Sequence, residues 1–255
     1  MYLKGWLLSL LILLIVVWGV VSIRNKTPLE DIKSINLSTD YEIDQVLEDI
    51  ELLQVNTVNV PIAIQIPDLT SNELSVIDYS EQRAIELIKI LKKRGIKVIL
   101  EPFPWISNGS EYETAYAPAD TNLFFEKWQD ILMYLIDNIA TPYKVDAMIV
   151  GSNFTLLEQY EQQWCDLIDN IHEKFHGLVT YKTSWWYTAQ WDDETHQIYE
   201  AKLTNELFSK VDFISIAAYF ELSGQRENTV EELVEAIYAT KLHDRQQNVE
   251  AEISN

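Results

Sequence analysis

Short apolar runs alternate with amphipathic stretches along most of this chain. From Pro28 onward, each run of aliphatic and β-branched residues is followed by a segment in which apolar residues recur three or four positions apart. The runs predict strands and the segments after them predict helices. We expect strands over residues 34–37, 57–64, 97–102, 146–151, 178–183 and 212–219.

The helices have recognisable start and stop signals. A capping box of the form Thr-x-x-Glu begins at Thr39 and again at Thr229, and predicts a helix start at each. Gly95 follows three basic residues and predicts the end of the second helix. Apolar stripes predict further helices around residues 124–135, 164–175 and 195–210.

The order of these elements indicates an α/β fold. Runs such as AMIVG and FISIA are apolar on both faces, as in parallel strands that helices cover. Six β/α units in succession predict a TIM-type (β/α)8 barrel, with a doubly wound sheet as the alternative. Because an eightfold barrel needs two more units, we expect an incomplete, truncated barrel over residues 28–255, whose two outermost strands lack a neighbour.

The amino-terminal segment has a different character. Residues 5–23 contain no charged side chain, and basic residues stand on both sides of them. This length and composition predict one transmembrane helix within residues 1–27. The run is longer than the apolar part of a signal peptide and lacks a small-residue cleavage site, so we expect an uncleaved anchor. The flanking charges are balanced and leave the orientation open.

Composition narrows the classes of function. The 255 residues include 19 basic and 40 acidic side chains, for a net charge of −21, which disfavours nucleic acid as a partner. The single cysteine, Cys165, excludes an intramolecular disulfide and a thiolate-built metal site. Eight tryptophans, 13 tyrosines and eight phenylalanines are a composition that suits surfaces on which sugar rings stack.

One short motif suggests zinc. The sequence from His172 to His176 reads HEKFH and matches the HExxH pattern of zinc peptidases. Gly177 predicts the end of the helix directly after the second histidine, so both ligands would lie on a fraying last turn. We therefore expect no metal and no other cofactor, and keep the zinc peptidase as an alternative.

Residues able to bind or cleave a ligand follow the ends of the predicted strands. The carboxyl ends of parallel strands meet at one face, where barrel enzymes have their active sites. Carboxylates, amides and indoles at that face can hydrogen-bond sugar hydroxyls and stack on sugar rings. Of two consecutive tryptophans in an extended chain, at most one faces that site. The candidates are Glu101, Phe103, Trp105, Ser152, Asn153, Lys182, Trp185, Trp186, Tyr219 and Glu221.

Four stretches carry a family resemblance: ILEPFPW, MIVGSNFTLLEQYEQQW, GLVTYKTSWW and VDFISIAAYFEL. With them, about residues 35–250 resemble glycoside hydrolase family 113, a family of retaining β-mannanases with a (β/α)8 barrel. The resemblance implies a general acid/base at the end of the fourth strand, a nucleophile after the seventh, and a strand-six tyrosine, here Tyr219, that hydrogen-bonds the nucleophile. No seventh strand is predicted here.

The resemblance departs at the acid/base. The family's Gly-x-Glu reads Gly151-Ser152-Asn153 in this chain, and an amide cannot donate a catalytic proton. Glu158 could substitute only by reaching back from the start of the following helix.

These observations favour a membrane-anchored protein whose barrel lies outside the membrane and acts on or binds a β-linked polysaccharide of mannan type. We expect this chain to be catalytically impaired. A non-catalytic glycan-binding module is the second hypothesis, in which Glu101, Trp105 and Trp185 hold the oligosaccharide.

Overall fold

A computed structural model describes residues 32–186, 193–241 and 247–254. The chain divides into two units, Met1–Lys33 and Ser34–Asn255, and almost all of the first lies outside the described residues. The predicted membrane segment, residues 5–23, is part of that undescribed region. Within the described ranges, no helix combines the length and the apolar character that crossing a bilayer requires.

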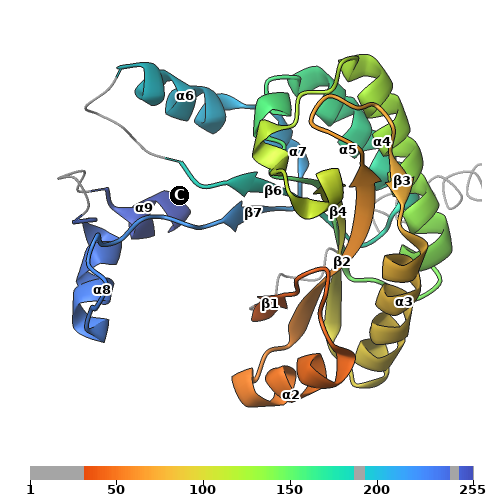
Figure 1. Ribbon diagram of the computed structural model, residues 1–255, viewed down its shortest axis with the longest axis horizontal. Coiled ribbons are helices and arrows are strands. Elements are labelled where there is room, and N and C mark those ends of the chain that lie inside the picture. Colours follow the sequence, from red (N-terminus) through yellow and green to blue (C-terminus); the bar gives the residue numbers. More distant parts are fainter. Residues whose placement is uncertain (1–31, 187–192, 242–246, 255) are drawn as a thin grey trace, which may run out of the picture. The chain divides into compact units, whose positions relative to one another are not determined.

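The second unit is built on a curled, half-barrel sheet of parallel strands with helices packed against it (Figure 1). Along the sheet the order is β1-β2-β4-β5-β6-β7, so each strand of this path pairs with the next one in the chain, and a short β3 pairs antiparallel with β2. The strands are β1 Ser34–Asn36, β2 Thr57–Ile66, β3 Ser75–Val76, β4 Lys97–Ile106, β5 Ala147–Ser152, β6 Leu178–Ser184 and β7 Phe213–Ala217.

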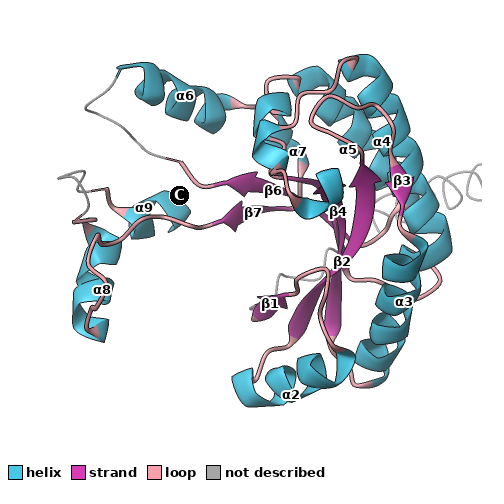
Figure 2. Ribbon diagram, viewed as in Figure 1, coloured by secondary structure: helices cyan, strands magenta, loops and turns pink. Residues whose placement is uncertain are grey.

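Helices lie between most successive strands, as the alternating pattern predicts, and two more follow β7, the last of the described strands (Figure 2). They are α2 Ile43–Leu53, α3 Asp78–Lys93, α4 Thr121–Leu135, α5 Glu161–Lys174, α6 Asp193–Thr204, α7 Leu207–Lys210, α8 Val230–Tyr238 and α9 Val249–Ser254. A π-helical turn, Ile136–Ala140, continues α4, and short 3-10 turns lie at Ser107–Gly109, Glu113–Ala115 and Thr155–Leu157.

The main core lies between the sheet and the helices α3, α4 and α5. Alternate residues of each strand point to this side, and they pack on an aromatic group that includes Phe124, Trp128 and Trp164. The indole of Trp128 donates a hydrogen bond to the Val150 carbonyl at 2.7 Å, so even the buried indole N–H has a partner. The opposite, concave face of the sheet does not belong to this core.

Gly151 fits this core only because it has no side chain. A Cβ at this position would lie 2.5 Å from the Tyr181 ring and 2.8 Å from the Trp164 ring. The backbone of β5 therefore approaches both rings directly, immediately before Ser152 and Asn153.

Several predicted boundaries were wrong. Strand β4 continues four residues beyond Pro102, so Phe103 and Trp105 belong to the strand instead of following it. The predicted capping box at Thr39 does not form, since α2 begins at Ile43 with no side-chain cap, whereas the box at Thr229 is present. The helix predicted over residues 195–210 is two helices, α6 and α7, separated at Asn205 and Glu206.

Apolar side chains are exposed toward the end of the chain. In β7, Ile214 is 48% exposed, while its neighbour in register on β6, Tyr181, is fully buried. On α8, the apolar Val230, Leu233 and Val234 are also exposed. Among the described strands β1 and β7 form the two edges of the sheet, and an apolar strand edge favours self-association.

We expect the purified protein to self-associate through this apolar surface. Replacing Leu233 and Val234 together by Lys should shift it toward monomer at equal concentration, because charges disrupt an apolar contact between copies. Leu52→Lys on α2, where the leucine is 79% exposed, is the matched control and should change nothing. Sedimentation over a range of concentrations measures the shift. A monomeric parent chain with one sharp thermal transition would contradict the expectation.

Candidate functional site

A row of polar side chains crosses the concave face of the sheet, with one residue from each of five neighbouring strands. They are Asn36 on β1, Asn59 on β2, Glu101 on β4, Ser152 on β5 and Lys182 on β6. The side chains form a connected set, because Asn59 Nδ2 lies 3.0 Å from Asn36 Oδ1 and 2.6 Å from Glu101 Oε2. The row is thus centred on one carboxylate.

Glu101 is 2% exposed and accepts hydrogen bonds from three other strands. Ser152 Oγ donates to Oε1 at 2.7 Å, and the Lys182 ammonium forms an ion pair with the same oxygen. A buried carboxylate is costly unless it is paired and hydrogen-bonded. The three partners meet that requirement and hold Glu101 in place within the sheet.

The two aromatic candidates on β4 follow Glu101 on the same face, two and four residues further along the strand. The Lys182 ammonium lies 5.9 Å from the centre of the Phe103 ring. Trp105 is partly exposed, and the backbone of Gly109 lies against its indole so closely that a Cβ there would be 2.4 Å from the ring. One edge of the Trp105 indole is therefore covered by the chain itself.

Asn153 stands in the left-handed region of backbone conformation, with φ of 54°. Asn tolerates this conformation better than most residues do. Its backbone N–H donates to the Lys182 carbonyl at 2.7 Å, and its side-chain Nδ2 donates to Glu113 Oε1 at 2.9 Å. The structure therefore brings a carboxylate from the loop between β4 and α4 to the side chain of Asn153.

The two consecutive tryptophans follow the end of β6 and meet one aromatic side chain. The ring centre of Phe220 lies 6.4 Å from that of Trp185 and 5.5 Å from that of Trp186. Both indoles are partly exposed. Phe220 thus links the connection after β6 to the segment after β7.

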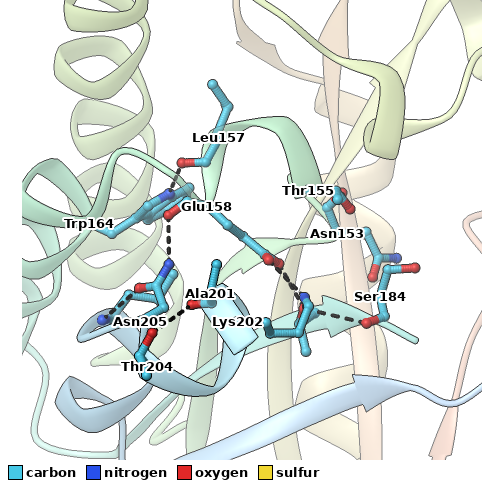
Figure 3. Close-up of polar contacts among 12 residues, drawn as sticks. Asn153, Thr155, Leu157, Glu158, Trp164, Ser184, Ala201, Lys202, Thr204 and Asn205 are labelled. Atoms are coloured by element: carbon cyan, nitrogen blue, oxygen red, sulfur yellow. Dashed lines mark hydrogen bonds and ion pairs between the residues drawn. The ribbon is translucent and has the colours of Figure 1, made fainter. Parts of the chain in front are cut away.

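Glu158 does not reach back to Asn153. Figure 3 shows its carboxylate directed toward Lys202, with Lys202 Nζ 2.7 Å from Glu158 Oε2. Thr183 donates to the other oxygen, Oε1, at 2.7 Å. Since Thr183 and Lys182 are consecutive in β6, their side chains point to opposite faces, so Glu158 lies behind the sheet relative to Glu101.

Tyr181 lies close to this ion pair and stays uncharged. Burial raises the pKa of the Tyr181 phenol well above its ordinary value, and the nearby Glu158 carboxylate raises it further. The cation that compensates the Glu158 charge is Lys202, 2.7 Å away.

The remaining two candidates lie at the surface. Tyr219 is 78% exposed and comes two residues after β7 ends, and Glu221 is exposed as well. Glu101 and Lys182 are thus in contact on the concave face, Trp105 lies further along β4, and Asn153 directly follows β5. The tryptophan pair follows β6, and Glu158 lies on the far face.

The HEKFH sequence does not form the helical turn that a zinc site of this type needs. Helix α5 ends at Lys174, and Phe175 is already extended, so His172 and His176 are not one helical turn apart. His172 Nε2 lies 3.1 Å from the Lys210 carbonyl oxygen. No group of three or more potential metal ligands occurs among the described side chains.

Three functional candidates escaped the sequence analysis: Asn59, Glu113 and Lys202. Asn59 is a polar residue inside an otherwise apolar strand run, and this signal could have identified it. Glu113 lies in a loop and Lys202 in a polar helix, and no sequence signal distinguishes either one from the charged residues around it. Only the folded chain shows that they meet Asn153 and Glu158.

Comparison with known proteins identifies the architecture. A sequence model of Glycoside Hydrolase Family 113 matches residues 36–248. A solved family 113 β-1,4-mannanase shares 22% identity at a TM-score of 0.63, over 76% of this chain and 64% of that one. The family 113 β-mannanase AaManA from Alicyclobacillus acidocaldarius, in complex with ManMIm, shares 16% identity at a TM-score of 0.63, over 82% and 68%.

A search of curated proteins found no match. The present chain spans about two thirds of the length of the two mannanases. At identities of 22% and 16%, the structural likeness establishes the fold.

We expect Lys182→Met to destabilise the protein strongly. The substitution leaves Glu101 buried without its cation, which costs about 3–5 kcal/mol of the free energy of unfolding. Lys241→Met is the matched control, because its pair with Glu235 is exposed and is worth less than about 1 kcal/mol. Urea denaturation measures both. Equal effects of the two substitutions would show that Glu101 does not depend on Lys182.

Proposed function

The chain belongs to glycoside hydrolase family 113, and on this basis we propose that it binds a β-linked polysaccharide of mannan type at the carboxyl ends of β4, β5 and β6. The observation that carries the proposal is the fixed carboxylate Glu101, held with Lys182 on the concave face and followed on the same strand by Phe103 and Trp105. Charged acceptors and donors beside aromatic rings are the usual equipment of a sugar-binding site.

We propose further that the chain binds this glycan without cleaving it. Retaining hydrolysis needs two carboxyl groups about 5–5.5 Å apart on either side of the scissile bond. Asn153 stands where the family resemblance expects the acid/base, and Glu158 is engaged by Lys202 behind the sheet. The strand that would bear the nucleophile is not among the strands of the described residues.

Affinity electrophoresis through a gel that contains a soluble β-mannan tests the binding. We expect the chain to be retarded. Trp105→Ala or Trp185→Ala should reduce the binding free energy by roughly 1–3 kcal/mol, as expected for truncating an aromatic residue in a binding site, and should thereby weaken the retardation. Tyr112→Ala, which truncates an aromatic residue that is 77% exposed, is the control and should leave the retardation unchanged. Hydrolysis of β-mannan should stay undetectable, also in Asn153→Glu, which supplies a proton donor but no nucleophile.

Two results would contradict this proposal. An unretarded chain would remove the binding function. Cleavage of an aryl β-mannoside that is lost in Glu101→Gln or Glu158→Gln would show that carboxylates already present carry out the hydrolysis.

We also propose that residues 5–23 anchor the protein in the cell membrane, with the barrel outside. This rests on the uncharged length of the segment, which matches one bilayer crossing. We expect the full chain to stay with membranes after alkaline carbonate extraction, and a chain that lacks residues 1–27 to be released. A full chain recovered in the extract would contradict the anchor, and protease digestion of intact cells tests the orientation.

A further inference from the structure

Among the described side chains of helix α6, a lysine is nearly buried while two large apolar residues are exposed. The side chain of Lys202 is 11% exposed, whereas Ile198 and Leu203 on the same helix are 60% and 59% exposed. Burial normally favours the apolar residues of a helix over a charged one. The reversed order means that α6 is held by a specific polar interaction.

The Lys202 ammonium is enclosed by groups from three separate segments. It bonds Glu158 Oε2 at 2.7 Å and the Thr183 hydroxyl, which in turn donates to Glu158 Oε1. The ammonium also lies over the rings of Trp186 and Phe208, whose centres are 5.8 Å and 5.7 Å from Nζ. An ammonium placed over aromatic faces is attracted to them, and most strongly to an indole.

This arrangement joins the segment that follows β5 to the segment that follows β6, and both border the proposed glycan site. Glu158 belongs to the segment that follows Asn153, and Thr183 lies three residues before Trp186. Asn205, just after α6, adds a hydrogen bond from its Nδ2 to the Glu158 carbonyl at 2.8 Å. Figure 3 shows Asn205 and Lys202 on either side of Glu158.

We propose that Lys202 is a positioning residue for glycan binding. By pairing with Glu158 and lying over the indole of Trp186, it fixes the tryptophan pair at the end of β6 relative to Asn153. The role rests on the glycan binding proposed above. It adds that the affinity of the concave face depends on an ion pair on the opposite side of the sheet.

An ion pair suits this task because its geometry is directional. Ile198 or Leu203 in that place could slide on an apolar surface, whereas Lys202 has one carboxylate and one hydroxyl to meet. Removing one partner of a buried pair leaves the other charge uncompensated, while removing both charges together avoids that penalty. The informative variant is therefore Lys202→Met combined with Glu158→Gln.

The experiment measures affinity in the β-mannan gel and thermal unfolding for the full chain and its variants. The matched control is Lys210→Met with Asp169→Asn, which removes a pair of the same length, 2.7 Å, at a more exposed position. We expect Lys202→Met with Glu158→Gln to remain folded at the assay temperature and to bind at least tenfold more weakly, and the control to bind within twofold of the parent.

A third background separates positioning from general stability. Trp186→Ala should also weaken binding, and adding Lys202→Met with Glu158→Gln to it should cause no further loss, because the indole through which Lys202 acts is already gone. A general loss of stability would instead add to the effect of Trp186→Ala.

Each outcome has one meaning. Unchanged affinity in Lys202→Met with Glu158→Gln would overturn the positioning role of Lys202, and so would a loss that adds to that of Trp186→Ala. Neither result would affect the proposed glycan binding. A parent chain that shows no retardation would overturn the proposed glycan binding and this role with it.

Discussion

The concave side of this protein is organised by the need to bury one carboxylate. Glu101 lies in the middle of β4, and a charge at that place is tolerable only if donors surround it. Asn59, Ser152 and Lys182 supply them from β2, β5 and β6. The requirement fixes the relative positions of these four strands. The surface that we propose for glycan binding is therefore shaped by the way in which one charge is satisfied.

Local signals predicted most of the framework. The apolar runs located the six parallel strands, and Gly95, with φ of 76°, ended α3 as expected. The same signals failed to locate the end of a strand where the end depends on pairing with neighbouring strands. The predicted strand ended at Pro102, and proline has no N–H to donate to a neighbouring strand. However, β4 pairs with β5 at Ile99 and Leu100 and then continues along β2 alone, where the prolines are tolerated.

The candidate site was predictable to the extent that it follows strands. Glu101, Lys182 and Asn153 could be placed near one another because consecutive parallel strands bring their carboxyl ends together. Glu113 and Lys202 could not, since each meets its partner across 40 or more residues of sequence, through loops whose path no local pattern specifies. The pairing of Glu158 could not be predicted for the same reason. Its own surroundings in sequence give no sign of the lysine, 44 residues later, that holds it.

The strand order also has a consequence for the synthesis of the chain. Because each barrel strand pairs with the next, the sheet can grow one strand at a time as the polypeptide emerges. Glu101, however, must wait for Lys182, which is 81 residues further along. At about 5–20 residues per second this interval is roughly 4–16 s. During it the carboxylate has only water and neutral donors, so we expect the inner side of the nascent sheet to stay hydrated until β6 has been translated.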